Sequence, residues 1–222
     1  YMRISPLNTP LDQKIRSKEG TWYPIFKEMV NKDIDTGDMM KRLFTNPSEV
    51  ETDSFSFGLN LYYLAADQNS LEHPVPLWDM FTSMEVQTWY KADMARLYMQ
   101  KGRCNTNLGR GWGLSERIFE HIIKKADEEI EEGGIRACFG HDVCIMALLA
   151  YMKADDWGIE DIDPANAWKY WKGWKVPMAS SLDFVFYKNS SGNVLMRPSL
   201  NGKALSLPIK CIGDGFYSWD EF

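Results

Sequence analysis

Residues 134–152 read GIRACFGHDVCIMALLAYM, and the interpretation of the whole sequence depends on this stretch. Its first part, Ile135 to Phe139, is a short apolar run of the kind that forms a buried strand. Its last part, Val143 to Met152, is a longer apolar run that predicts a buried helix. A polar pair, His141 and Asp142, separates the two runs. The stretch therefore predicts a strand, a sharp turn and a helix, with the polar pair at the turn.

The polar pair has two interpretations. A strand that leads into a helix places His141 and Asp142 at the carboxyl end of the strand, where open α/β sheets hold ligands. The same residues then lie at the amino-terminal end of the helix, where unpaired backbone N–H groups and the helix dipole favour an anion. In the alternative, Asp142 only caps the helix and His141 is a polar residue at a strand end. A dipeptide is a weak motif, and spacing alone favours this second interpretation.

Helical and strand-like patterns divide the sequence into two regions. Apolar residues recur at helical spacing through most of residues 1–113, where Thr82 and Glu85 have the spacing of a capping box. Beyond residue 114, a long helical pattern ends at Gly133, and NSSGN at 189–193 joins two strand-like runs as a hairpin turn. We therefore predict a mainly helical region over 1–113 and an α/β region over 114–222, with the helices as a separate cover.

Composition and charge exclude several classes of protein. The chain has 222 residues, of which 45% are hydrophobic, so it can bury a substantial core. Its formal net charge of -6 argues against a nucleic-acid-binding surface. No apolar stretch has the length of a membrane span, and the first residues, YMRISPLNTPLD, lack the apolar centre of a signal peptide. The four cysteines are Cys104, Cys138, Cys144 and Cys211. Their spacing is not that of a metal site, and their disulfide state stays open. Cys138 and Cys144 lie in apolar runs and are expected to be buried.

The segment RACFGHDVCIMALLAYM resembles the carboxyl-terminal active-site motif of the histidine acid phosphatases, in which a strand ends in His-Asp and an apolar helix follows. The preceding SERIFEHIIKKADEEIEEGG is similar to that family's long helix, and VPMASSLDFVFYK and NVLMRPSLNGKALSLPI are similar to its later strands. PLWDMFTSMEVQTWY resembles part of its helical cap. The resemblance covers most of Pro76 to Phe222 and is closest to bacterial members that group with inositol-polyphosphate phosphatases. It implies an α/β fold, a histidine-phosphatase-type sheet flanked by helices, with a mainly helical cap.

The resemblance implies hydrolysis of a phosphate monoester in two steps through a phosphohistidine. His141 would contact the phosphoryl group and Asp142 would protonate the leaving alcohol, with no cofactor and no metal. The family's nucleophile lies in an Arg-His-Gly motif, which this sequence does not contain; its other histidines are His73 and His121. We therefore expect the chain to be the later part of a larger phosphatase that lacks the amino-terminal nucleophile strand. On its own it is expected to be inactive, with that amino-terminal segment as its partner.

The resemblance also implies a substrate class and a location. The expected substrates are phytate-like inositol phosphates or other phosphomonoesters, and the expected location is periplasmic or secreted. Arg103 and Arg110 flank a Gly- and Asn-rich loop, GRCNTNLGRGWG, and are candidate substrate-binding residues because guanidinium groups bind phosphate oxygens as a fork. An ordinary solvated loop is the favoured interpretation of this segment.

Three functions from other classes remain open. A metal-dependent phosphohydrolase with a His-Asp pair needs several more ligands, and three histidines in total leave such a site nearly unfillable. A glycan-binding module would use Trp168, Trp171 and Trp174, which recur every third residue, although the pattern favours packing on the core. A phosphatase-like domain that binds without catalysis is the third. An Arg-His-Gly motif upstream of Tyr1 would distinguish the enzyme from this last possibility.

Overall fold

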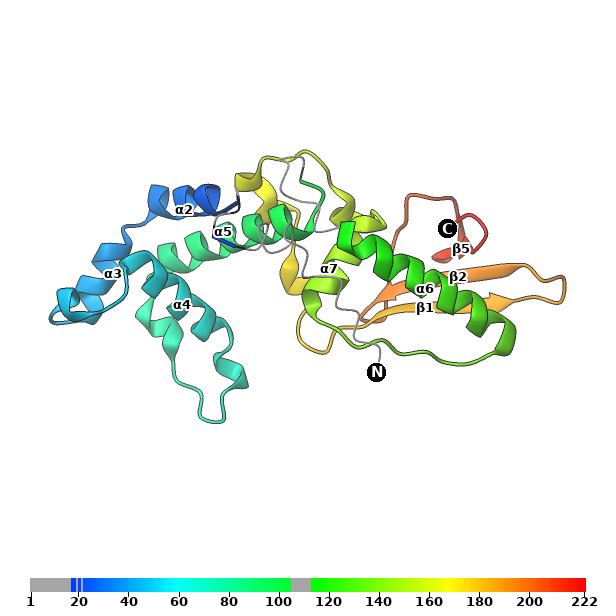
Figure 1. The fold of residues 1–222 in the computed structure, drawn as a ribbon, viewed down its shortest axis with the longest axis horizontal. Helices are drawn as coiled ribbons and strands as arrows, with labels where there is room; N and C mark the ends of the chain where they lie inside the picture. Colours follow the sequence, from blue (N-terminus) through cyan, green and yellow to red (C-terminus); the bar gives the residue numbers. More distant parts are fainter. Residues whose placement is uncertain (1–16, 19, 21, 105–112) are drawn as a thin grey trace.

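The computed structural model describes residues 17–18, 20, 22–104 and 113–222. Two halves follow one another along its long axis (Figure 1): helices α2 to α5 form one half, and α6, α7 and an antiparallel sheet form the other. The helices are α2 (Trp22–Asp33), α3 (Thr36–Leu43), α4 (Ser54–Ala66), α5 (Ser83–Lys101), α6 (Gly113–Glu132) and α7 (Asp142–Tyr151). The short 3₁₀ helices are η1 (Pro47–Glu49), η2 (Gln68–Ser70), η3 (Leu77–Met80), η5 (Asp155–Gly158), η6 (Pro164–Lys169) and η7 (Gly173–Lys175).

Local signals in the sequence determine where several helices begin and end. The capping box at the start of α5 is confirmed: Glu85 N–H donates to Thr82 Oγ1 at 3.2 Å, and Thr82 N–H donates to the Glu85 carboxylate at 2.6 Å. The Asp53 carboxylate accepts from Ser56 N–H at 3.0 Å and begins α4 in the same way. At the end of α6, Gly133 adopts a φ of 72°, in the left-handed region that glycine tolerates. These ends confirm the helical pattern expected from the sequence.

Helix α5 lies at the centre of the helical half. Trp89 is fully buried, and its ring centroid lies 6.1, 5.3 and 6.3 Å from those of Phe26, Phe55 and Tyr62. Gly58 of α4 approaches so closely that a Cβ atom there would be 2.9 Å from Trp89 Cζ2. Helix α5 also packs against α2, α7 and η6, and the buried residues of both halves form one continuous core.

The sheet is antiparallel throughout. Strands β1 (Leu182–Lys188) and β2 (Val194–Leu200) form the expected hairpin, with Leu182 opposite Leu200 and Lys188 opposite Val194. The strand order is β1-β2-β5-β4, and the short β3 also pairs with β2. The remaining strands are β3 (Lys203–Ala204), β4 (Cys211–Gly213) and β5 (Phe216–Ser218). The chain is therefore of the mixed α/β class, with its strands after its helices.

Helix α6 covers one face of the sheet (Figure 1). Phe184 and Phe186 of β1 point to this face, where their rings lie 6.1 Å from Phe222 and 4.9 Å from Trp219. The Trp219 indole N–H donates to the Asp127 carboxylate of α6 at 2.8 Å. Phe184 and Phe186 are thus half-buried on this side of β1, whereas Val185 and Tyr187 alternate with them on the other side.

The opposite face of the sheet is more open. Val185 is 46% exposed and Tyr187 is 51% exposed. Strand β1 also lies at the edge of the sheet, so the backbone groups on its outer side have no strand partner within the described residues. Unpaired edges of this kind are able to pair with another strand.

Tyr217 fastens the segment between β3 and β4 to the sheet. Its buried hydroxyl accepts from Leu207 N–H at 3.0 Å and donates to the Leu205 carbonyl at 3.3 Å. Tyr217→Phe is expected to lower the free energy of unfolding by about 1–2 kcal/mol, because a buried N–H is left without an acceptor. Urea denaturation measures this, with Tyr187→Phe on the exposed face as a control of near-zero effect. Equal stability of the two variants would contradict the role of the hydroxyl.

The strand predicted at Ile135 to Phe139 is not formed, and this prediction is wrong for the described residues. The segment between α6 and α7 is an irregular trace in Figure 1, and every residue from 131 to 140 is exposed. Ile135 is 97% exposed and Phe139 is 92% exposed. A strand needs a neighbour to pair its N–H and C=O groups, and none of the described strands lies beside this segment. The expected burial of Cys138 is wrong for the same reason, whereas Cys144 in α7 is half-buried.

Candidate active site

His141 and Asp142 lie at the amino-terminal end of α7, as the sequence predicts. His141 has extended backbone angles, φ -97° and ψ 155°, and is the N-cap residue, while Asp142 is the first residue of the helix. The His141 carbonyl accepts from Cys144 N–H at 2.9 Å, but the His141 side chain makes no capping bond. Both side chains are exposed. Both residues lie at a helix end where the unpaired N–H groups and the helix dipole favour negative charge.

The rest of α7 explains why this end is held at the surface. Its later residues enter the core, where Leu149 and Ala150 are fully buried. Helix α7 packs on α6, and the rings of Tyr151 and Phe119 lie 5.1 Å apart. Because the carboxyl-terminal half of α7 is fixed in the core, its polar first residues are presented to solvent. The apolar run that follows the His-Asp pair thus positions the pair.

Within the described residues, neither His141 nor Asp142 forms a side-chain hydrogen bond or an ion pair. The segment that leads to them is held mainly at its start, where Arg136 Nε donates to the Glu129 carboxylate at 2.8 Å. No group of three or more His, Cys, Asp or Glu side chains in the described part of the chain has a metal-binding arrangement. The functional groups of the described site are therefore the His141 imidazole, the Asp142 carboxyl group and the backbone N–H groups at the start of α7.

Arg103, a candidate substrate contact, lies at the end of α5 and is engaged with protein groups. Its guanidinium forms an ion pair with Glu160, and Lys153 Nζ lies 3.1 Å from the same carboxylate. Hydrogen bonds from Lys153 and Arg103 hold the pKa of the Glu160 carboxyl below its ordinary value. The second candidate, Arg110, lies outside the described residues. The structure thus gives Arg103 a role in joining α5 to the segment after η5.

The three tryptophans of the possible glycan platform have different environments. Trp171 is 2% exposed and belongs to the core, whereas Trp174 is 61% exposed. Trp168 is half-buried, and the ammonium groups of Lys91 and Lys169 lie 5.1 and 5.9 Å from its ring centroid. Core packing is thus confirmed for Trp171 and wrong for Trp174. The burial of Trp171 prevents a continuous stacking surface made from all three rings.

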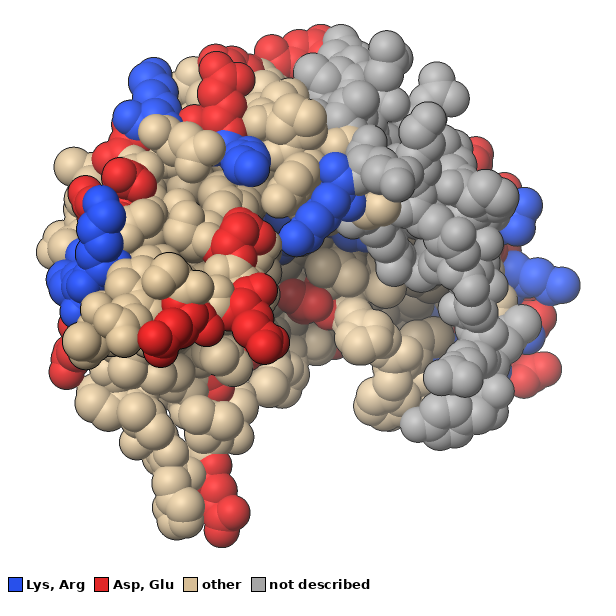
Figure 2. Space-filling view, turned by 60° about the vertical axis from the view of Figure 1, so that its left-hand side comes forward, with Lys and Arg blue, Asp and Glu red and all other residues tan. Residues whose placement is uncertain are grey.

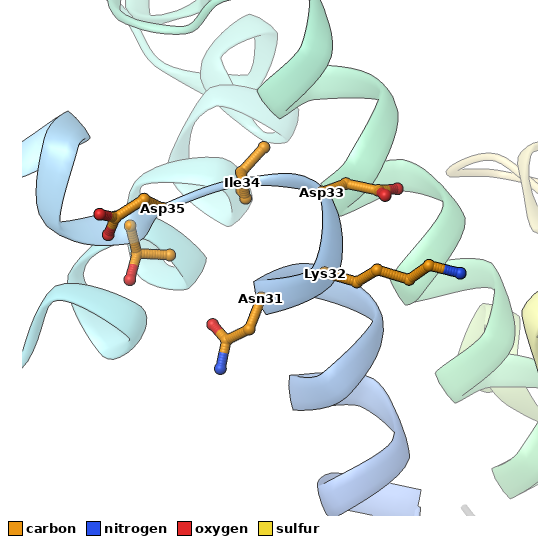
Figure 3. A pocket seen from close by; sticks show the side chains of 6 residues that line it. Asn31, Lys32, Asp33, Ile34 and Asp35 are labelled. Atoms are coloured by element: carbon orange, nitrogen blue, oxygen red, sulfur yellow. The ribbon is translucent and has the colours of Figure 1, made fainter.

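Two cavities among the described residues are lined by residues of α2, one of them together with α5 and η6. One of about 330 Å³ opens where α2 meets α3 and is lined by residues 31–36 (Figure 3). Acidic and basic side chains are interspersed over the face shown in Figure 2, without one broad field of either sign. None of the helices in the described ranges is both long and apolar enough to cross a bilayer. The sequence does not predict these cavities, because the residues that line them form no motif.

The structure thus has a His-Asp pair at the amino-terminal end of α7 in a mixed α/β chain, a place where unpaired N–H groups favour an anion. The family model described as the histidine phosphatase superfamily (branch 2) matches residues 8–201. The chain belongs to this superfamily. No curated protein is similar enough in sequence to be matched to it.

Proposed function

We propose that the chain is part of a phosphomonoesterase that works through a phosphohistidine, with His141 as a phosphate contact and Asp142 as the proton donor. The observation that carries this proposal is the exposed His-Asp pair at the amino-terminal end of α7, within the span matched by the family model. An imidazolium and helix N–H groups stabilise charge on phosphoryl oxygens. A carboxylic acid supplies the proton that a poor alkoxide leaving group needs.

The proposed reaction has two steps. In the first, the histidine of an Arg-His-Gly motif attacks phosphorus, a P–N bond forms and the P–O bond to the alcohol breaks, while Asp142 gives its proton to the departing oxygen. In the second, water attacks the phosphohistidine, the Asp142 carboxylate takes a proton from that water, and phosphate leaves as the P–N bond breaks. His141 contacts the phosphoryl oxygens in both steps. Acid and base roles thus alternate on one carboxyl group.

The nucleophile is proposed to come from a segment outside these 222 residues, since the sequence contains no Arg-His-Gly. The bare apolar segment at Ile135 to Phe139 supports this, because exposed apolar residues are costly unless they are covered. A strand placed against this segment would end beside His141, since neighbouring parallel strands end at the same edge of a sheet. The chain alone is then an incomplete enzyme with no turnover.

The finer parts of the proposal concern substrate and location. We propose acid phosphatase activity on inositol phosphates or related phosphomonoesters, in the periplasm or outside the cell. The proposed substrate class and the proposed location both rest on the resemblance to bacterial members of the family described above. A non-catalytic phosphatase-like protein is the alternative. A glycan-binding module would rest on Trp174 and the half-buried Trp168, because Trp171 is buried.

Trapping of the phosphoenzyme tests the proposal. A longer chain that includes an Arg-His-Gly motif is expected to form an acid-labile phosphohistidine with an aryl phosphate, visible by ³¹P NMR after rapid denaturation. The 222-residue chain and the motif's His→Ala variant are expected to form none. In the longer chain, amide hydrogen exchange at residues 135–139 is expected to slow markedly, because those N–H groups gain partners. Turnover without a phosphoenzyme, or a longer chain that lacks Arg-His-Gly, would overturn the catalytic proposal.

A further inference from the structure

Two lysines, Lys32 and Lys91, line a cavity beside Trp168, in a part of the molecule that the His-Asp site does not include. A cavity of about 180 Å³ lies between α2, α5 and η6, and its lining includes Met29, Lys32, Asp33, Thr88, Lys91 and Trp168. Lys169, the residue after Trp168, directs its ammonium group over the same ring at 5.9 Å from the centroid. Residues from three distant parts of the sequence thus form one small cavity that carries two lysines and one aspartate.

The three lysines of this cluster are not among the described lysines that form ion pairs with carboxylates. Lys41, Lys125 and Lys188 form ion pairs with Asp38, Glu128 and Glu131. By contrast, Lys32, Lys91 and Lys169 have no carboxylate within ion-pair distance among the described residues, although Lys169 donates to the Asn166 amide oxygen at 2.7 Å. Two such ammonium groups at the cavity and a third over the Trp168 ring outnumber the one carboxylate of the lining, and they create a local positive potential in a chain of net charge -6.

The directions of the side chains place this charge at the cavity. In Figure 3, Lys32 and Asp33 point toward helix α5, while Asn31 points to the other side of the α2–α3 connection. Lys91 of α5 lies against Trp168, with 5.1 Å between its ammonium nitrogen and the ring centroid. The ring restrains this lysine, so less side-chain freedom is lost when the lysine binds a ligand. Asp33 is the one acidic group in the lining, and it reduces the positive potential without cancelling both lysines of the lining.

We propose that this cavity binds a small phosphate-bearing anion, either free orthophosphate or the terminal phosphate of a small ester. Lysine ammonium groups bind phosphate as point charges, and Thr88 also lines the cavity. The cavity is smaller than the roughly 300–1,000 Å³ of sites for larger organic ligands, which matches a compact anion. The proposal does not depend on the function proposed for His141 and Asp142.

Titration of the ¹⁵N-labelled chain with sodium phosphate tests the site, with ionic strength held constant by sodium chloride. The Trp168 indole signal, assigned through Trp168→Phe, is expected to shift in a saturable way. Lys32→Met together with Lys91→Met is expected to weaken binding at least about tenfold, since methionine keeps the apolar stem and removes the charge. Asp33→Asn is expected to strengthen binding by about threefold to tenfold, because a nearby negative charge is removed.

Two matched variants show whether the shift comes from an anion bound in this cavity. Lys41→Met removes an exposed, ion-paired lysine of α3, and His141→Ala removes the proposed phosphate contact of the active site; both are expected to leave the Trp168 titration unchanged. Methylphosphonate distinguishes the two sources of the anion: saturation by it alone indicates an ester-type ligand, and saturation by orthophosphate indicates the free ion. The proposal is overturned if neither anion saturates the signal, if chloride shifts it equally, or if His141→Ala abolishes the shift. An unchanged phosphate affinity in the double lysine variant would overturn the proposal too. If the double lysine variant is too unstable to measure, Asp33→Asn still tests the site, because it is expected to change the phosphate affinity in the opposite direction.

Discussion

Replacing Asp142 with asparagine is expected to lower the turnover of alkyl and inositol phosphates by about two to four orders of magnitude, the usual contribution of general acid catalysis. The measurement is made in the longer chain that carries the Arg-His-Gly motif. Asparagine has the shape of aspartate and is a good helix N-terminal residue, so the fold and phosphate binding are expected to persist. It has no acidic proton to give to an alkoxide. Aryl phosphates are expected to lose much less, because a phenolate leaves without a proton.

His141→Ala provides the contrast, since it removes a phosphoryl contact and leaves the acid in place. It is expected to lower turnover of aryl and alkyl phosphates by similar factors, because both present the same phosphoryl oxygens. Steady-state kinetics of both variants on both substrate classes across a range of pH distinguish the roles. If Asp142→Asn slows good and poor leaving groups equally, then Asp142 is no proton donor and only begins α7, which is the structural interpretation of the His-Asp pair.

Trp89→Ala is expected to lower the free energy of unfolding by about 3–5 kcal/mol, the range for removing a large aromatic side chain from a core. Trp89 is fully buried and contacts three aromatic rings from α2 and α4. The surrounding helices also pack on α5 through other residues, so the cavity left by the missing ring cannot collapse completely. Chemical denaturation followed by circular dichroism measures the loss.

Trp174→Ala is the matched control for Trp89→Ala, because the same side chain is removed from a position that is 61% exposed. Its expected effect is within about 0.5 kcal/mol, as for surface substitutions in general. Trp89→Phe is expected to lie between the two variants, since it keeps part of the buried ring. Similar losses for Trp89→Ala and Trp174→Ala would show that burial in the aromatic cluster does not account for the stability of α5.

Local signals make much of this fold predictable from the sequence. The capping box at Thr82, the glycine at 133 and the hairpin turn within residues 189–193 each act over a few residues, and each is confirmed. The strand expected at Ile135 to Phe139 is wrong because a strand is defined by its neighbour, which a local pattern does not contain. The burial expected of Trp174 is wrong because Gly173 packs closely on α5, where a Cβ atom would lie 3.1 Å from Leu97 Cδ1, and the chain turns there. Regular three-residue spacing therefore does not mean a common face.

The candidate sites are predictable to different degrees for a related reason. His141 and Asp142 are adjacent in the sequence and precede an apolar helix, so a motif is enough to find them. Lys32, Lys91 and Trp168 come from three separate elements, and only the packing of α2 and η6 on α5 brings them together. Arg103 is only a candidate phosphate ligand in the sequence, and the sequence does not reveal Glu160 as its partner.

The burial of α5 on nearly all sides has a consequence for how the protein melts. This helix contacts α2 and η6 and also α7, whose first residues include the proposed proton donor. Neither the helices before it nor the α/β part after it can lose structure without exposing the apolar residues they share with it. The two regions recognised in the sequence are thus thermodynamically linked, and heating is expected to produce one cooperative heat-absorption peak instead of two independent ones.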